Sequence, residues 1–454
     1  MRVFQVMARP FIAFVERFYP DPFIFAIGLT FVVIAMALGL TPTTPIEVVQ
    51  HWGDGLQKLL AFMAQISITL VTAHALAHTD LVHRLLIRLA RLPRSAFWSY
   101  AFTALIAGIA SLISWALGLI AGALVAREVG IQARKRGIPV HYPLLCASAY
   151  SGIVIWHMGY SGSAPLFVAT PGNALEQQLG GIIPVTQTIL SSWNISLALI
   201  TLVLVPFICA LMAPARENAI EVPAEFVAED AEQLENPEAD SPAGRSFAHI
   251  LDHSRVFNWG IGLLLVAYLA YWFATEGLNL NLNIVNWTFL AAGLLLARSA
   301  AHYARLVGNA SMTVGQVLVQ YPFYAGIMGI MLGSGLASVI AEWFTAIASA
   351  STLPFWAFLS GGLINMFVPS GGGQWVVQGP IFLEAAKSLG TAPALIVMGI
   401  AYGDQWTNLI QPFWTIPLLA IAGIHMRAIL GYCFVVLLVT FFIFGGGLLV
   451  VAAG

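Results

Sequence analysis

The sequence predicts an all-α polytopic membrane protein, with about nine transmembrane helices and two re-entrant hairpins in two inverted-topology repeats. Three observations predict this fold: a strongly apolar composition, a series of span-length apolar runs, and polar or glycine-rich breaks inside some of them. Of the 454 residues, 59% are hydrophobic and only 9% are charged, whereas about 25% are charged in ordinary soluble domains. So few charged side chains cannot cover the apolar surface in water, and we therefore expect lipid to be the solvent.

The apolar runs supply the predicted transmembrane helices, each of which needs about 20 residues. Nine runs approach or exceed this length, at about 21–40, 58–78, 143–169, 187–213, 257–274, 285–300, 314–340, 393–422 and 429–451. Two further stretches, 97–127 and 353–386, are too long for one crossing and are interrupted near the middle by polar and glycine residues. Each of these two either crosses once with a loop or enters and leaves on the same face.

The positions of Lys and Arg favour the hairpin interpretation of both stretches, because these residues gather on the cytoplasmic side of membrane proteins. With a cytoplasmic N-terminus and two hairpins, every Lys and Arg except Lys58 and Lys387 falls on the inside or its interface. If stretch 97–127 crossed the bilayer instead, the cluster 127–136 would face the opposite side from the cluster 84–94. Two hairpins therefore fit the charges better.

The same topology predicts two inverted repeats. Residues 1–213 form the first repeat with its hairpin at about 97–127, and residues 285–454 form the second with its hairpin at about 353–386. The span at 257–274 connects them and reverses the orientation of the second repeat. A shift of 252 residues places Ala149-Tyr150 on Ala401-Tyr402 and lays one hairpin on the other.

Residues 214–256 are expected to be a cytoplasmic linker between the repeats. They are rich in Asp and Glu and contain proline, a composition typical of solvated segments. The three cysteines of the chain all lie inside apolar runs. They predict neither a disulfide framework nor a zinc site.

The second hairpin carries the clearest candidate binding site, because backbone that leaves a helix at membrane depth must be buried in protein or line a cavity. Its break reads Asn-Met-Phe-Val-Pro-Ser-Gly-Gly-Gly-Gln from Asn365 to Gln374. Free N–H groups of successive glycines at a helix start can hold an anion. The predicted substrate ligands are Asn365, Ser370, Gly371, Gly372, Gly373 and Gln374, together with Thr407 and Asn408 of the following span. The alternative is a flexible turn that permits close packing.

The span after the second hairpin is also interrupted, and it contains Asp404, Thr407 and Asn408 on one helical face. A carboxylate within a span is costly unless it is paired or protonated. Asp404 and Asn408 are therefore the candidates for cation or proton coupling, with a sodium ion near Asp404, Asn365 and Asn408. The alternative is a neutral, hydrogen-bonded Asp404 that braces the broken helix. No other bound cofactor is expected.

The first repeat supplies a less polar counterpart of this site. Its hairpin tip contains Ser114 and Trp115, and the following interrupted span contains His157 and Ser161, which we predict to contact substrate. His157 could relay a proton or act only as a hydrogen-bond donor. The spans lack Arg and Lys away from their ends, which favours one substrate carboxylate over two. Five tryptophans flank the breaks and could enclose a small apolar tail: Trp115, Trp156, Trp375, Trp406 and Trp414.

Three segments together resemble one transporter family. They are the run 365–374, the pattern Gly403-Asp404-x-x-Thr407-Asn408-x-x-x-Pro412, and the segment 148–165. They are similar to the short-chain fatty acid (acetoacetate/butyrate) transporter family, and the similarity covers nearly the whole chain. That family is similar in turn to the ion-transporter superfamily, whose members have inverted repeats with paired hairpins and often form dimers that work by an elevator motion.

The resemblance implies a secondary active transporter that takes up short-chain monocarboxylates across a bacterial inner membrane, driven by a proton or sodium gradient. It also implies a homodimer in the lipid bilayer, and no nucleic-acid partner is expected. Related dicarboxylate and amino-acid carriers share the Pro-Ser-Gly and Gly-Asp-x-x-Thr-Asn signals. A related carrier of this kind is therefore an alternative.

Two functions of other classes remain as alternatives. Gly159-Tyr160-Ser161-Gly162 matches the Gly-x-Ser-Gly pattern of intramembrane serine proteases, in which a histidine activates the serine. Such four-residue patterns recur by chance in glycine- and serine-rich spans, so we expect no enzyme. A passive anion channel would give flux that neither saturates nor follows an ion gradient.

Overall fold

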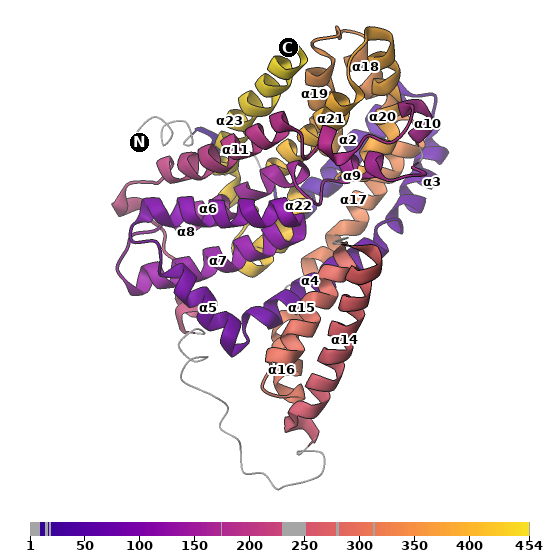
Figure 1. Cartoon of the computed structure of the whole chain (residues 1–454). Helices are drawn as coiled ribbons and strands as arrows, with labels where there is room; N and C mark the ends of the chain where they lie inside the picture. Colours follow the sequence, from indigo (N-terminus) through magenta and orange to yellow (C-terminus); the bar gives the residue numbers. More distant parts are fainter. Residues whose placement is uncertain are drawn as a thin grey trace.

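The fold is helical throughout the part of the chain that the structure describes (Figure 1). A computed structural model describes residues 10–13, 17, 20–173, 175–228, 251–277, 281–311 and 314–453. Within these ranges, seven helices are long and apolar enough to cross a membrane, or eight if one bent pair counts as a span. They confirm an all-α polytopic membrane protein. The central part of the linker prediction, 229–250, lies outside the described residues.

Five of the seven long helices contain predicted spans, and the other two form the stretch predicted as the first hairpin. The five are α2 (Pro22–Leu40), α3–α4 taken together (Pro45–Leu56 and Leu60–Ala77), α11 (Ser192–Leu211), α14 (Arg255–Glu276) and α23 (Met426–Ala453), and the other two are α6 (Ala96–Ile113) and α7 (Trp115–Lys135). Local sequence fixes several of their starts. The Asp21 side chain accepts from the Phe23 N–H before α2, and the Ser191 hydroxyl accepts from the Asn194 N–H at α11.

The stretch predicted as the first hairpin is two antiparallel helices, α6 and α7, that turn at Ser114. A β-carbon on Gly118 would lie 2.8 Å from the Ser111 Cα, and one on Gly122 would lie 3.0 Å from the Ala107 Cβ. Residues of the two helices thus pair at equal distances in sequence from the turn, as expected for antiparallel helices. Figure 1 shows α6 and α7 side by side. Whether this hairpin re-enters the bilayer stays a prediction.

The second predicted hairpin is α19 (Leu353–Asn365) and α20 (Gly371–Leu389), separated by a short non-helical break. The Ser360 hydroxyl donates to Gln378 Oε1 across the pair, at 3.0 Å. Helix α19 also packs closely on α21 (Pro393–Thr407). A β-carbon on Gly403 of α21 would lie 2.5 Å from the Gly362 nitrogen. Only glycine fits this contact, which brings the hairpin against the second broken span.

In both predicted interrupted spans, the α-helix ends where polar residues occur in the apolar run. The run 143–169 forms α8 (Tyr142–Ser151), the 3-10 helix η1 (Gly152–Met158) and α9 (Ser163–Ala169). The run 393–422 forms α21, the 3-10 helix η5 (Asn408–Ile410) and α22 (Pro412–Ala422). The two halves therefore contain the same order of hairpin and broken span. Their inverted orientation in a membrane stays a prediction.

Three of the predicted spans differ in the structure. The run 314–340 is a bent pair, α17 (Gly315–Gly333) and α18 (Leu336–Thr345), with an angle of 62° between them. Gly335 has a φ of +75° at the bend, a conformation that glycine adopts without strain. The run 285–300 forms the 15-residue helix α15 (Leu282–Leu296). The helical part of the run 187–213 begins only at Ser192.

Several helices lie outside the predicted spans. They are α3, α5 (Asp80–Ala90), α16 (Ala300–Ala310), the short α10 (Glu176–Leu179) and the 3-10 helices η2 (Val185–Gln187) and η3 (Arg216–Asn218). Helices α15 and α16 lie beside α4, and α14 lies beside α15, away from the hairpins (Figure 1). The main buried core instead surrounds α7, α8, η1, α21 and α22.

Candidate functional site

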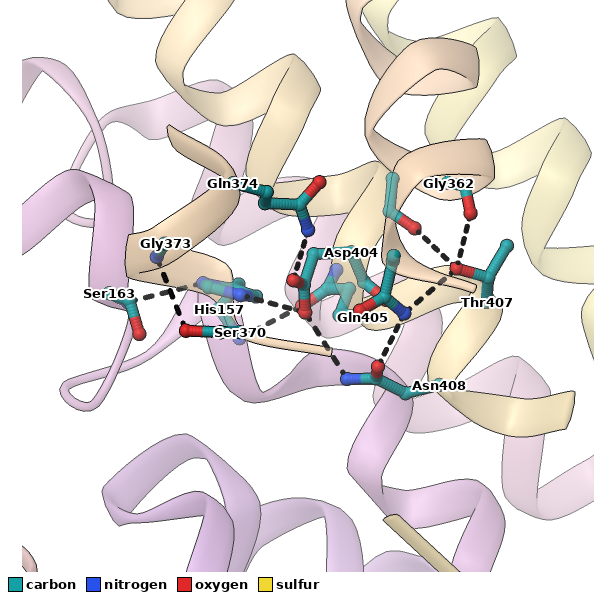
Figure 2. A network of polar contacts seen from close by, with 12 residues as sticks. His157, Ser163, Gly362, Ser370, Gly373, Gln374, Asp404, Gln405, Thr407 and Asn408 are labelled. Carbon is teal, nitrogen blue, oxygen red and sulfur yellow. Dashed lines mark hydrogen bonds and ion pairs between the residues drawn. The ribbon is translucent and has the colours of Figure 1, made fainter. Parts of the chain in front are cut away.

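The candidate site is centred on Asp404, which is fully buried in α21 (Figure 2). Its Oδ2 accepts a hydrogen bond from Gln374 Nε2 of the second hairpin. Its Oδ1 accepts from Asn408 Nδ2 at 3.3 Å and lies 3.2 Å from His157 Nε2. The second hairpin and both broken spans therefore meet at one carboxylate. We call these residues, with Asn365 and Thr407, the Asp404 network.

Gln374 is oriented toward Asp404 by a short relay of side chains. The Ser360 hydroxyl donates to Gln378 Oε1 at 3.0 Å, and Gln378 Nε2 donates to Gln374 Oε1 at 2.7 Å. With its oxygen occupied in this way, Gln374 presents its amide nitrogen to the carboxylate. All four side chains are fully buried, so each needs these partners.

Asn365 ties the end of α19 to the break in α21. Its Nδ2 lies 2.7 Å from Asn408 Oδ1 and 3.0 Å from both the Asp404 carbonyl oxygen and Thr407 Oγ1. The Thr407 hydroxyl in turn donates to the Gly362 carbonyl at 2.9 Å. The Asn365 Oδ1 is buried and accepts no hydrogen bond within the described chain. Several oxygens therefore lie beside Asp404, and oxygen atoms are the ligands that a sodium ion requires.

The two ring nitrogens of His157 have different neighbours, and one of them faces the network. Nδ1 lies 3.2 Å from the Ser163 backbone N–H, which donates to it. Nε2 therefore carries the proton in the neutral ring and faces Asp404. The His157 backbone N–H donates to Gln405 Oε1 at 2.9 Å. A β-carbon on Gly371 would lie 2.7 Å from His157 Nε2, so a bare glycine lets the second hairpin approach the imidazole.

Two helix starts converge beside His157, at Gly371 of α20 and Ser163 of α9 (Figure 2). Such starts favour negative charge. The Ser370 hydroxyl accepts from the Gly373 N–H at 3.2 Å, so this amide is already capped. The prediction of three free glycine amides is wrong at Gly373. The N–H groups of Gly371 and Gly372 have no acceptor among the described residues.

The tip of the first hairpin lies against the break in the first broken span. The Trp115 backbone N–H donates to Ser161 Oγ at 3.0 Å, and the Tyr160 N–H donates to the Leu112 carbonyl at 2.7 Å. Ser114, at the turn itself, is buried. No hydrogen bond joins Ser161 to His157 in the described chain, so the arrangement lacks the serine–histidine pair of a protease.

Three of the five predicted tryptophans form an aromatic cluster beside the network. The ring centroids of Trp115 and Trp414 are 5.0 Å apart, and those of Trp156 and Trp414 are 6.0 Å apart. The Trp156 ring lies 3.6 Å from the His157 ring. Trp406 is elsewhere, packed on Phe358 at 4.9 Å. Trp375 packs against Gly379 on its own helix.

Comparison with known proteins identifies the family. Residues 3–451 match the family model described as short chain fatty acid transporter. The chain belongs to the short-chain fatty acid transporter family. It is 42% identical over 448 residues to an Escherichia coli (strain K12) protein named "Putative short-chain fatty acid transporter", covering 98% of this chain and 99% of that protein. A Haemophilus influenzae protein of the same name is 38% identical over 441 residues, covering 96% and 97%. This member is thus a transporter rather than an enzyme.

Two solved transporter structures also resemble this member of the short-chain fatty acid transporter family along most of its length. One is MtrF of Neisseria gonorrhoeae, a structure described with a class of antimetabolite efflux pumps, with a TM-score of 0.38, 14% identity and 97% coverage of each chain. The other is YdaH of Alcanivorax borkumensis, described as having an unusual topology, with a TM-score of 0.42, 14% identity and coverage of 94% and 98%. At these scores the likeness carries no argument about the site.

The site of this family member contains buried donors that lack acceptors. In the described chain they include Trp156 Nε1, Gln405 Nε2 and Trp414 Nε1. Leaving one buried donor unpaired costs about 1–3 kcal/mol, and these three donors lie in or next to the two breaks. The sequence analysis missed Gln405 and Gln378. Glutamine inside an apolar run was the available signal, because an amide in lipid needs a partner.

Proposed function

We propose that the protein is a secondary active transporter that takes up short-chain monocarboxylates, coupled to a cation gradient. The observation that carries the proposal is the Asp404 network, in which one fully buried carboxylate joins the second hairpin to both broken spans. Membership of the short-chain fatty acid transporter family supports the substrate class. The proposed location is a bacterial inner membrane, with the N-terminus cytoplasmic and the protein a homodimer.

The proposed substrate site lies between the two hairpin tips. There Gly371 and Gly372, at the start of α20, lie beside His157 and Ser163, and their N–H groups would supply a positive helix end for one carboxylate. The aromatic cluster next to His157 offers an apolar wall for a short tail. The network contains no Lys or Arg within the described residues, which favours a monocarboxylate over a dicarboxylate.

The proposed coupling site is Asp404 with its oxygen-rich neighbours. A sodium ion would be bound by the Asp404 carboxylate, the unpartnered Asn365 Oδ1 and Asn408 Oδ1. The Asn365 amide would first have to rotate, because its nitrogen now contacts Asn408 Oδ1 and the Asp404 carbonyl oxygen. A proton would instead reside on Asp404 or His157, whose facing atoms are 3.2 Å apart. In either case, loading removes net negative charge from the network and favours binding of the anionic substrate.

Two groups of helices in the structure could move relative to each other and carry the loaded site. The hairpins and broken spans pack together in the main core, whereas α15 and α16 pack on α4, and α14 packs on α15. We propose that the first group moves across the bilayer against the second, as in an elevator, because transporter repeats commonly move as rigid bundles.

Uptake by purified protein in proteoliposomes tests this function. Radiolabelled butyrate uptake is measured with an inward sodium gradient, an inward proton gradient, or neither, and with unlabelled succinate as competitor. We expect saturable accumulation with only one of the two gradients and weak competition by succinate. Butyrate flux that neither saturates nor responds to a gradient would indicate a passive channel and contradict the proposal.

A further inference from the structure

Trp156 and Trp414 are buried tryptophans whose indole N–H groups have no acceptor. Their side chains are 2% and 4% exposed, and neither Nε1 forms a hydrogen bond within the described chain. Trp406 provides the contrast. It lies in the same broken span as Trp414, and its Nε1 donates to the Leu437 carbonyl at 2.8 Å. The structure therefore pairs the indole N–H of Trp406 but leaves those of Trp156 and Trp414, like those of Trp52 and Trp375, without an acceptor among the described residues.

Both unpaired indoles lie between the first hairpin tip and the Asp404 network. Trp156 directly precedes His157, and its ring centroid is 3.6 Å from that imidazole. Trp414 is in the first turn of α22, directly after the second break. Each ring also contacts Trp115 at the first hairpin tip, with centroids 6.5 Å and 5.0 Å away. The two indoles thus border the place proposed for the substrate carboxylate.

The chemistry of the groups indicates an anionic partner. An indole N–H only donates, and a carboxylate only accepts and has room for several donors. Asp404 does not supply that acceptor, because its oxygens contact Gln374, Asn408 and His157 instead. We propose that Trp156 Nε1 and Trp414 Nε1 donate hydrogen bonds to the carboxylate of the transported monocarboxylate. This assignment rests on the proposed function and adds two substrate-binding residues from the broken spans.

The test removes the indole N–H of each tryptophan by substitution with phenylalanine, which keeps an aromatic ring. Trp156→Phe and Trp414→Phe are assayed in proteoliposomes for the KM of butyrate and of its 3-oxo analogue acetoacetate, and for the maximal rate and cation dependence. We expect KM to rise about tenfold in each variant, as for loss of a charge-assisted hydrogen bond. The rise should be equal for both substrates, with the cation dependence unchanged. Trp406→Phe is the matched control and should leave KM unchanged.

If a phenylalanine variant folds poorly, a replacement that conserves the shape of tryptophan tests the same hydrogen bond. Benzothienylalanine at position 156 or 414 replaces the N–H by sulfur and keeps the bicyclic shape, and it should give the same increase in KM. Unchanged KM for both substrates would overturn the proposal. An increase for acetoacetate alone would also overturn it, because the donors would then address the oxo oxygen. Failure of the proposed function would look different, since the unmodified protein would itself show no saturable, gradient-driven uptake.

Discussion

Asn365 has one amide group that contacts three acceptors on α21 and η5 and leaves its own oxygen unpaired. An unpaired buried oxygen is normally unfavourable. Because it lies next to a buried carboxylate, we propose that this oxygen is a ligand for the coupling cation. Under this proposal Asn365 would have two roles, fastening the hairpin in this structure and contributing an oxygen to a bound ion.

Asn365→Ala should therefore reduce transport more than it reduces folding. It removes hydrogen bonds to Asn408 and Thr407 together with the candidate ligand oxygen. We expect butyrate uptake in proteoliposomes to fall about tenfold or more, with the cation concentration for half-maximal uptake raised. Asn258→Ala on α14 is the control, because Asn258 is also buried but lies outside the network. Equal losses in both variants would contradict a specific role for Asn365.

The structure brings several of the predicted site residues together through contacts that the sequence does not predict, and their roles stay predictions. Asn365, Gln374, Asp404 and Asn408 were predicted because polar groups in apolar spans need partners. The contact between His157 and Asp404 could not be predicted, because the residues are far apart in the chain and only packing of the two halves joins them. The free glycine amides were overestimated at Gly373, where the serine before the helix acts as a cap.

Close helix contact is the main property at the scale of elements. Helices α19 and α21 meet through glycines, and a β-carbon on Gly403 would lie 2.5 Å from the Gly362 nitrogen and closer still to the Phe358 carbonyl oxygen. Small residues at a membrane helix interface let backbones approach. This approach allows the Thr407 hydroxyl to reach the Gly362 carbonyl.

Gly403→Ala should force α19 and α21 apart. We expect a loss of stability of about 1–3 kcal/mol, as for overpacked cores, and a larger fractional loss of uptake. The midpoint of thermal unfolding in detergent and butyrate uptake are the two measurements. Gly446→Ala on α23 is the matched control, because nothing lies within 4 Å of its added methyl group. An unaltered midpoint for Gly403→Ala would show that the contact is looser than described.

Hydropathy located the long helices but missed elements with mixed composition. Helix α3 contains Glu47, His51 and Asp54, so its apolar fraction is too low for a span-length signal. It nevertheless packs on α17, where a β-carbon on Gly55 would lie 3.0 Å from the Gly329 Cα. The bend between α17 and α18 was also missed, because a glycine within an apolar run does not by itself predict a change of direction.

An ion pair joins α5 to the segment after α15, away from the site. Arg298 donates to both Asp80 carboxylate oxygens, at 2.7 and 2.8 Å. This hydrogen bonding lowers the pKa of Asp80 below its ordinary value. The pair therefore stabilises the fold above that ordinary pKa, and its contribution is lost as the pH falls through the lowered value.

Arg298→Ala should lower the unfolding midpoint in detergent at pH 7 and have a smaller effect near pH 3. Both groups are partly exposed, so we expect a modest shift that decreases with salt. Arg216→Ala, in η3, is the control and should show no such pH dependence. A destabilisation of the same size at both pH values would mean that the ion pair is not its cause.

Membrane placement of the hairpins is testable at the scale of the whole molecule. The three native cysteines are fully buried, so single cysteines can report accessibility. We expect Leu92→Cys and Lys135→Cys, at the two ends of the first hairpin, to react with a membrane-impermeant thiol reagent from the cytoplasmic side. Ser351→Cys and Ser388→Cys, near the ends of the second, should react from the opposite side. If the two ends of either hairpin react from different sides, that segment crosses the bilayer.

We propose that Asp404 couples an ion gradient to substrate movement. The most direct test compares gradient-driven butyrate uptake with butyrate exchange in proteoliposomes, for the unmodified protein and Asp404→Asn. Asparagine keeps the size of the side chain but removes the charge that Gln374, Asn408 and His157 surround. We predict that Asp404→Asn abolishes uptake against a concentration gradient and removes the cation dependence of any remaining exchange. Accumulation by Asp404→Asn with the cation dependence of the unmodified protein would contradict the account.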